Sequence, residues 1–156
     1  MHWTESIDVD RPVPEVRAAI ADEHELMQWS AWPEATGYTC SVDGDGVSPG
    51  SEIVFRDRSG VVQGRQRLLA ASDDRVEYRL RNRLPAGREM TPEVDFRIED
   101  LGGGRSRVHL DFRATPPLPP VLRQLAGLVA GRRVRALHVR DLEQLKAHVE
   151  RRPAVP

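Results

Sequence analysis

The side chains best suited to chemistry in this sequence are polar residues that interrupt apolar rows. Gln66 stands two residues before Leu68 in one such row, and Asn82 stands two residues after Leu80 in another. Glu5 interrupts a similar row near the N-terminus. If the rows are strands, these polar side chains point inward, where they could orient a bound molecule or transfer a proton. The alternative for Glu5 and Asn82 is a strand end that reaches solvent.

Aromatic residues are few, and most fall in the same inward rows. The chain has three Trp, two Tyr and three Phe. Four are in phase with the aliphatic residues of their own stretch: Phe55, Tyr78, Phe96 and Phe112. Two more, Trp29 and Trp32, stand in a short segment after residue 28. Such rings either fill a core or line the wall of a cavity. We take them, with the flexible Met90, as candidate ligand contacts.

The C-terminal third carries further candidates on a helical stripe. Leu122, Leu125 and Val129 recur at helical spacing and would share the face turned toward a sheet. Arg132 falls in the same sector, where it could neutralise an anionic group of a ligand. If the helix bends at the poor helix former Gly131, Arg132 lies in solvent instead.

The sequence lacks the signatures of covalent, metal-dependent and nucleotide-dependent chemistry. The five histidines show no metal-ligand spacing, and no GxSxG motif marks a nucleophilic serine. A single cysteine, Cys40, excludes a disulfide within the chain. The glycines of residues 101–106 are typical of a hairpin turn and not of a phosphate-binding loop. We therefore expect no metal and no cofactor, and we name no catalytic residue.

Charge and hydropathy exclude further classes of protein. Lys and Arg number 23 against 24 Asp and Glu, a formal net charge of -1, so no overall field attracts nucleic acid. Arginines cluster at 132, 133 and 135, but acids on the same predicted helix indicate a solvated face. No apolar run reaches about 18 residues, and the N-terminus has acids where a signal peptide would be apolar. We expect a cytoplasmic protein without stable membrane insertion.

Periodicity predicts the strands and short helices that must position these side chains. Alternation indicates one strand over residues 2–9 and six more between residues 38 and 112. Short polar or Gly-rich turns separate these six strands, so neighbours run antiparallel. Two short helices are expected between the first two strands, one after Pro14 and one over residues 23–29.

A long helix follows the last strand. Residues 121–152 lack proline and are rich in Leu, Ala, Arg and Glu, which predicts helix, with a bend or break near Gly131 where the apolar stripe shifts. The length of 156 residues suits one domain. We assign that domain to residues 1–152 and a tail to residues 153–156.

This order of elements resembles the START/helix-grip (SRPBCC) superfamily. Besides the order of elements, two segments support the resemblance: Trp29-Ser30-Ala31-Trp32-Pro33 after the short helices, and residues 142–150 near the end of the long helix. That superfamily includes START lipid-transfer domains, pollen-allergen-like ligand binders, coenzyme Q-binding proteins and bacterial polyketide cyclase/dehydrase-like proteins, the last two being the branch that this chain is most similar to. The resemblance covers about residues 2–152. It implies an α+β helix-grip fold, in which a seven-stranded curved antiparallel sheet, two short helices and a long C-terminal helix over the concave face enclose a cavity.

Three functions remain open at this point. The first is binding of a small lipophilic molecule, such as a lipid, a quinone or a polyketide-like aromatic, between the sheet and the C-terminal helix. The second, implied by the resemblance, is an aromatase/cyclase-type enzyme, for which the candidate proton-moving or positioning groups are Glu5, Tyr78, Gln66, Asn82 and Arg132. The third is a protein-interaction module. Whatever the function, we expect a monomer or a weak homodimer. Residues 83–91 and 29–33 are expected to flank the entrance to the cavity.

Overall fold

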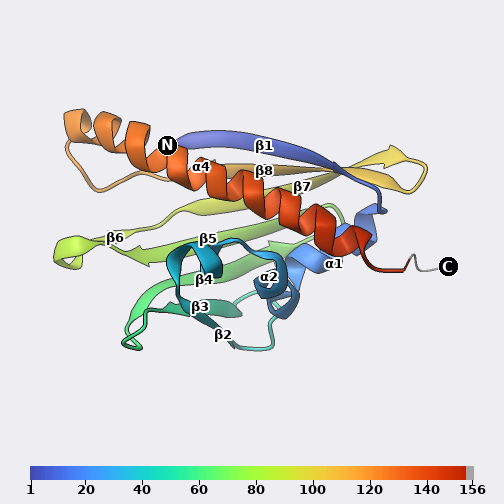
Figure 1. Cartoon of the computed structure of the whole chain (residues 1–156), viewed down its shortest axis with the longest axis horizontal. Helices are drawn as coiled ribbons and strands as arrows, with labels where there is room; N and C mark the ends of the chain where they lie inside the picture. The colour runs from blue at the N-terminus through green and yellow to red at the C-terminus, as the bar shows by residue number, and fades with distance from the viewer. Residues whose placement is uncertain (154–156) are drawn as a thin grey trace.

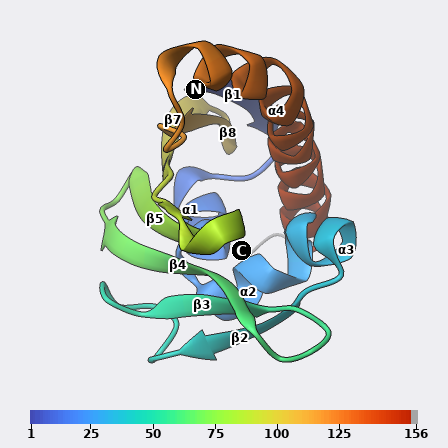
Figure 2. The ribbon, with the colours of Figure 1, turned by 90° about the vertical axis from the view of Figure 1, so that its left-hand side faces the viewer.

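An antiparallel sheet of eight strands curves around the helices in the computed structural model, which describes residues 1–153 (Figure 1 and Figure 2). In the last helix, the side chains of residues 120, 121 and 123–129 fall outside the described part. The strands are β1 (His2–Val9), β2 (Thr39–Asp43), β3 (Glu52–Arg56), β4 (Val62–Ala71), β5 (Arg75–Arg83), β6 (Glu89–Met90), β7 (Glu93–Gly102) and β8 (Arg105–Arg113). The helices are α1 (Val13–Ala21), α2 (Glu23–Trp29), α3 (Trp32–Thr36) and α4 (Pro120–Glu150), with a single 3-10 turn, η1 (Pro85–Gly87).

The first strand pairs with the last, which gives the sheet the order β1-β8-β7-β5-β4-β3-β2, with β6 beside β5. Trp3 of β1 lies opposite Phe112 of β8, and the amino group of Met1 donates a hydrogen bond to the Ala114 carbonyl at 2.6 Å. The remaining neighbours follow one another along the chain because short turns join them. Both ends of the strand region therefore meet at one edge of the sheet, where α4 packs on β1.

The α+β helix-grip architecture predicted from the sequence is confirmed, with two additions. The short strand β6 forms because the chain folds back after η1, so that Asn82 lies opposite Met90. A third short helix, α3, follows the two that were predicted. It has Pro33 in its first turn, and it ends at Gly37, which adopts the left-handed conformation at φ 70°.

The sequence predicted a bend or break near Gly131, and a break there is wrong because α4 runs without interruption for 31 residues. Gly131 is buried where the helix lies on β1. A Cβ atom there would stand 3.5 Å from Met1 Sδ and 3.8 Å from Trp3 Cζ3. The glycine marks a close approach of the helix to the strand, and tertiary packing outweighs its weak helix propensity.

The core fills the space between α1, α2 and the β5–β7–β8 part of the sheet. Trp29 Nε1 donates to the Ala19 carbonyl at 2.9 Å, and the Tyr78 hydroxyl donates to the Ile20 carbonyl at 2.8 Å. The rings of Trp29 and Phe96 meet edge to face at 6.5 Å. Fully buried aliphatic side chains surround them, among them Val9, Val16, Leu68, Val76, Val108 and Leu110. These rings therefore belong to the core, with their polar atoms paired to α1.

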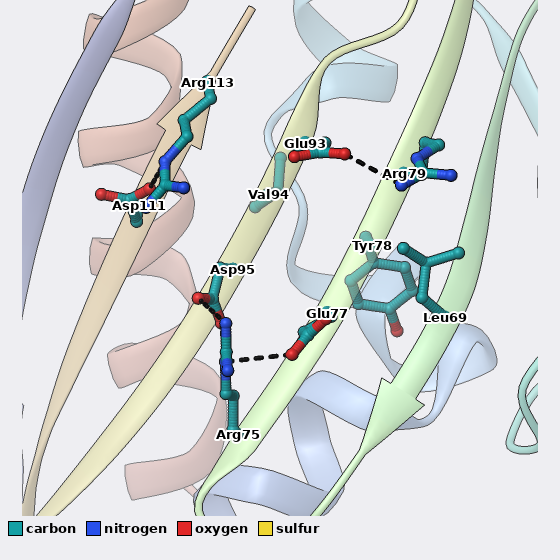
Figure 3. Close-up of a pocket in the computed structure, with 10 residues that line it drawn as sticks. All are labelled: Leu69, Arg75, Glu77, Tyr78, Arg79, Glu93, Val94, Asp95, Asp111 and Arg113. Atoms are coloured by element: carbon teal, nitrogen blue, oxygen red, sulfur yellow. Dashed lines mark hydrogen bonds and ion pairs between the residues drawn. The ribbon is translucent and has the colours of Figure 1, made fainter.

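The opposite face of the sheet carries paired charges (Figure 3). Arg75 pairs with Asp95 at 2.7 Å and with Glu77 at 3.1 Å, and Arg79 pairs with Glu93 at 2.9 Å. These residues alternate along β5 and β7 with the buried ones, so they lie on the outer face. A hollow of about 110 Å³ between them is lined largely by these pairs. Because its charges already have partners, we regard the outer face as a solvated surface.

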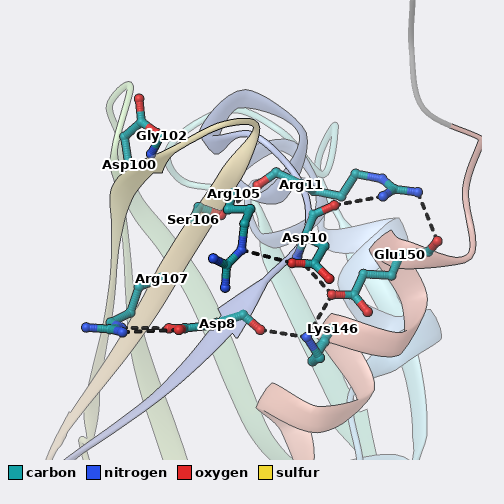
Figure 4. A network of polar contacts seen from close by, with 10 residues as sticks. All are labelled: Asp8, Asp10, Arg11, Asp100, Gly102, Arg105, Ser106, Arg107, Lys146 and Glu150. Atoms are coloured by element: carbon teal, nitrogen blue, oxygen red, sulfur yellow. Dashed lines mark hydrogen bonds and ion pairs between the residues drawn. The ribbon is translucent and has the colours of Figure 1, made fainter.

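Polar contacts fasten the C-terminal end of α4 to β1 (Figure 4). Lys146 Nζ donates to the Asp8 carbonyl at 2.8 Å and pairs with Glu150 at 2.8 Å, and Glu150 accepts from the Asp10 amide at 2.8 Å. The Asp8 side chain pairs with Arg107 of β8 at 2.6 Å. On its inner face this part of α4 buries three apolar side chains, Leu142, Leu145 and Val149. The helix is thus fixed to the edge of the sheet by both apolar and polar contacts.

Substitution of Gly131 by Ala should stabilise the protein. The new methyl group would meet Met1 and Trp3 at ordinary contact distance, and alanine favours a helix interior over glycine by about 1 kcal/mol. Urea denaturation should therefore show a free energy of unfolding about 1 kcal/mol above that of the wild type. The control is Ala130→Gly at the exposed preceding position, which should lose about the same amount. A less stable Gly131→Ala variant would mean that α4 lies closer to β1 than the structure shows.

Candidate ligand-binding site

A hollow of about 220 Å³ lies on the concave side of the sheet, between α3 and the strands β3 to β5. In Figure 2, α3 lies above β2 and β3, in the lower half of that view. Ten described residues line it: Trp32, Thr36, Tyr38, Phe55, Gln63, Gly64, Gln66, Leu80, Asn82 and Arg83. Thr36 and Arg83 are exposed, which places the mouth of the hollow between them. The described lining comes from α3 and the strands, whereas the sequence predicted a cavity under the C-terminal helix.

The floor of the hollow has room for the Asn82 amide because Gly64 has no side chain. Gly64 lies in register between Phe55 of β3 and Asn82 of β5. A Cβ atom on Gly64 would stand 2.8 Å from Asn82 Oδ1 and 3.3 Å from the Arg81 carbonyl oxygen. The Asn82 amide therefore lies across the position that a larger residue would fill. An isolated glycine within a strand is a sequence signal for such a close approach, and the sequence analysis did not use it.

Two side-chain amides in the hollow are available to a ligand. Among the described residues, neither Gln66 nor Asn82 has a side-chain hydrogen-bond partner. Gln63, at the rim, differs because its amide nitrogen donates to the Asp57 carboxylate at 2.5 Å. An amide with unused donor and acceptor capacity beside apolar walls is the kind of group that orients a bound molecule.

The wall formed by α3 is held in place by α4. The Asp141 carboxylate accepts hydrogen bonds from the Ala31 amide at 2.7 Å and from the Ser30 hydroxyl at 3.3 Å. Arg140 pairs with Glu34 at 2.6 Å. No residue of α3 itself is buried, so these polar contacts, and not a hydrophobic face, position the helix. Burial raises the pKa of Asp141 to about 7.

A buried histidine stands one helical turn before Asp141. His138 Nδ1 accepts a hydrogen bond from Trp3 Nε1 at 3.1 Å, and its ring lies 4.8 Å from Phe112 and 6.0 Å from Trp32 between centroids. Burial lowers the pKa of His138 to about 4, so the imidazole is neutral in this cluster. The sequence analysis missed His138 and Asp141, although His138 stands four residues before Leu142 on the buried stripe of the helix.

A third buried titratable group, Glu23, joins α2 to the turn between β2 and β3. Its side chain is fully buried and accepts a hydrogen bond from the Ser51 hydroxyl at 2.6 Å, and Ser51 in turn accepts from the Gly46 amide at 2.8 Å. Burial raises the pKa of the Glu23 carboxyl. Glu23 does not line the hollow, and its contacts are those of a structural anchor.

The structure separates the residues proposed from the sequence into distinct places. Four line the hollow together: Trp32, Phe55, Gln66 and Asn82. Four rings are buried in the core: Trp29, Tyr78, Phe96 and Phe112. Met90 is half-buried opposite Asn82 and packs against the core. Phase along a strand gives the face of each residue but does not tell whether a helix covers it, which is why core and hollow could not be distinguished.

The remaining candidates lie away from the hollow or outside the described part. Leu122 is 52% exposed. The side chains of Leu125 and Val129 are outside the described residues. Glu5 forms an ion pair with Arg135, and Arg132 is exposed. Of the five groups considered for proton transfer, the structure therefore brings only Gln66 and Asn82 into the hollow.

The described lining of the hollow combines apolar walls with polar groups. It holds aromatic and aliphatic walls, three amides, two hydroxyls and one guanidinium, and no carboxylate or imidazole. The ionisable side chains in this lining are those of Tyr38 and Arg83. Acid–base catalysis needs an acid and a base that converge on one point, and the described lining offers no such pair. Within the described residues, no group of three or more His, Cys, Asp or Glu side chains could hold a metal ion.

The pKa of Asp141 predicts how stability depends on pH. A carboxyl whose pKa is raised from 3.8 to about 7 by folding stabilises the fold in its protonated form, and this contribution is lost as the pH rises toward 7. The variant Asp141→Asn keeps an acceptor oxygen but carries no charge. Its free energy of unfolding, relative to wild type, should therefore rise between about pH 4 and pH 7 and then level off. His138 titrates in both proteins, so it cancels in the difference.

The variant Asp141→Ala serves as the comparison, because it removes the acceptor altogether. It should be less stable than Asp141→Asn by about 1–3 kcal/mol at every pH, since the Ala31 amide loses its partner. Urea denaturation across the pH range measures both differences. A difference between wild type and Asp141→Asn that stays constant from pH 4 to pH 8 would contradict the assignment.

Comparison with known proteins places this geometry in a family. The family described as polyketide cyclase / dehydrase and lipid transport matches residues 1–150. Protein CV1439 from Chromobacterium violaceum has 19% sequence identity and a TM-score of 0.68, with coverage of 97% of this chain and 98% of that chain. Hypothetical protein jhp0584 from Helicobacter pylori has 11% identity and a TM-score of 0.69, with coverage of 96% and 88%. Protein MLL2253 from Mesorhizobium loti has 15% identity and a TM-score of 0.65, with coverage of 98% and 99%. At these identities the structures show a shared fold.

Two further findings bear on the assignment. A search of curated proteins gives no match. In the part of the chain that the structure describes, α4 and the shorter helices are all too short or too polar to cross a membrane. The family match extends over nearly the whole chain, and the resemblance to the helix-grip superfamily is confirmed by both the match and the fold. This chain belongs to the polyketide cyclase/dehydrase and lipid transport family, whose fold binds hydrophobic ligands.

Proposed function

We propose that this protein binds a small lipophilic molecule in the hollow between α3 and strands β3 to β5. The observation that carries the proposal is the lining itself, in which Trp32, Phe55 and Leu80 form apolar walls around the amides of Gln66 and Asn82. A concave, mostly apolar site with a few polar groups is the usual form of a small-molecule site. Membership of a family with lipid transport in its description supports the same function.

The size of the hollow limits the ligand to a small molecule or to one end of a larger one. Water occupies about 30 Å³ per molecule in the liquid, so about 220 Å³ corresponds to about seven water molecules. Sites for drug-sized ligands span roughly 300–1,000 Å³. A molecule of one or two rings fits this space, whereas a long alkyl chain would leave most of its length outside.

Binding is favoured over catalysis by the groups present. Proton transfer in an aromatase/cyclase-type reaction needs a base with a matched pKa within reach of the substrate. Asp141 and His138 are buried side chains of α4 that do not line the hollow, and they accept hydrogen bonds from the Ala31 amide and from Trp3. The Asp57 carboxylate, which accepts from Gln63, is also outside the described lining. The hollow thus has the means to retain a molecule and to orient it.

Blocking the mouth should weaken binding. We choose 5-indanol, a neutral two-ring probe of suitable size, and measure its affinity by isothermal titration calorimetry. Thr36→Trp places a large ring at the exposed rim and should weaken binding at least fivefold, because the ring occupies the entrance. The matched control is Ala35→Trp, which adds the same ring to an exposed position of the same helix that does not line the hollow. Its affinity should stay within twofold of wild type.

Two results would contradict the proposal. One is the absence of saturable binding of 5-indanol to the wild type. The other is an equal effect of Thr36→Trp and Ala35→Trp, since the probe would then bind elsewhere. Circular dichroism of both variants checks that the loss of the Thr36 hydroxyl contact to the Trp32 carbonyl leaves the fold intact.

A further inference from the structure

The polar groups of the hollow are not distributed evenly between its mouth and its inner end. Gln66 lies in register between Ile53, which is fully buried, and Leu80. The next inward pair of the same two strands is Leu68 and Tyr78, which belongs to the core. Gln66 is therefore the innermost polar group of the lining, next to the core and remote from the exposed rim.

The second amide lies on the floor. Asn82 and Gln66 occupy diagonal positions of neighbouring strands, because Asn82 pairs with Gly64 and Gln66 pairs with Leu80. Diagonal partners have Cβ atoms about 7–8 Å apart or less, so one ligand group can reach both amides. The missing side chain at Gly64 lets the Asn82 amide lie across β4, and Asn82 lines the hollow. Both amides lack partners among the described residues, so both need a hydrogen bond from whatever fills the hollow.

The inner end recognises a neutral group and not an ion. Arg83 is the charged residue in the described lining, and it is exposed at the mouth. A carboxylate held between Gln66 and Asn82 would lose its hydration without meeting an opposite charge, which is unfavourable. A hydroxyl or carbonyl oxygen suits two amides, because an amide both donates and accepts hydrogen bonds.

We infer that the ligand enters this hollow polar end first, and that Gln66 and Asn82, with Gly64 beneath them, select a neutral oxygen-bearing ring over a hydrocarbon or an anion. The inference rests on the proposed function and deepens it. The apolar part of the ligand then faces the mouth, against Trp32 and Phe55. This orientation is the reverse of one in which a hydrocarbon tail occupies the inner end and a polar head remains in solvent.

Three probes of one shape test the selection. They are 5-indanol, indane and indane-5-carboxylate, and their affinities for the full chain are measured by titration followed in amide chemical shifts, which detects weak binding. For the wild type, 5-indanol should bind at least fivefold more tightly than indane, and indane-5-carboxylate should bind more weakly than 5-indanol. The variants Gln66→Leu and Asn82→Leu should each bring the ratio of 5-indanol to indane affinity close to one, because an apolar side chain has no hydrogen bond to lose.

Two further variants separate this role from a general effect on the fold. Gly64→Ala should reduce the ratio as Asn82→Leu does, since its methyl group displaces the Asn82 amide. Gln28→Leu is the control, because it makes the same change at an exposed position of α2 that does not line the hollow, and it should leave the ratio at the wild-type value. Indane binding itself should persist in all four variants, which shows that the hollow remains formed.

The outcomes distinguish the inference from the function on which it rests. Equal affinities of 5-indanol and indane for the wild type, tightest binding of the carboxylate, or an effect of Gln28→Leu as large as that of Gln66→Leu would overturn the inference while leaving a lipophilic site in place. Failure of all three probes to bind would overturn the proposed function and the inference together.

Discussion

The seating of α4 on β1 is the contact on which the rest of the structure depends. The pairing of β1 with β8 places Trp3 beneath the helix, where Gly131 permits close approach and His138 accepts the Trp3 hydrogen bond. One turn further on, Asp141 holds the start of α3. Because α3 buries no side chain of its own, the wall of the hollow stands where α4 puts it. The hollow is thus formed by the strands and by α3, which is held by a helix fixed at the far edge of the sheet.

The concave face divides into two regions with different roles. Under α1 and α2 the large side chains meet one another and their polar atoms are paired, as with Tyr78 and Ile20, so this region supplies stability. Under α3 the same face has a glycine and two unpartnered amides where a core would have apolar side chains. These amides are half-buried, so they can bond to water or to a ligand, and a ligand that binds the folded state alone stabilises it.

The sequence predicted the fold more fully than the site, and the reasons are physical. Alternation located the strands because one face of each is buried, and it nominated Phe55, Gln66 and Asn82 correctly as residues of the concave face. Alternation could not separate these three residues from Tyr78, because it does not show which helix covers each part of a strand. The glycine at 131 was misread because propensity is a weak guide where a helix packs closely. Asp141 was missed because its role depends on a helix that lies 110 residues away in the sequence.

The most direct test of this account is the position of a bound molecule, measured by intermolecular nuclear Overhauser effects in the complex with 5-indanol. The account predicts contacts from the ring protons to Phe55 and Trp32, and contacts from the oxygen-bearing edge to the side-chain amide protons of Gln66 and Asn82. Contacts instead to residues of the outer face, such as Arg75 and Asp95, or a reversed ring with its oxygen-bearing edge beside Arg83, would contradict it.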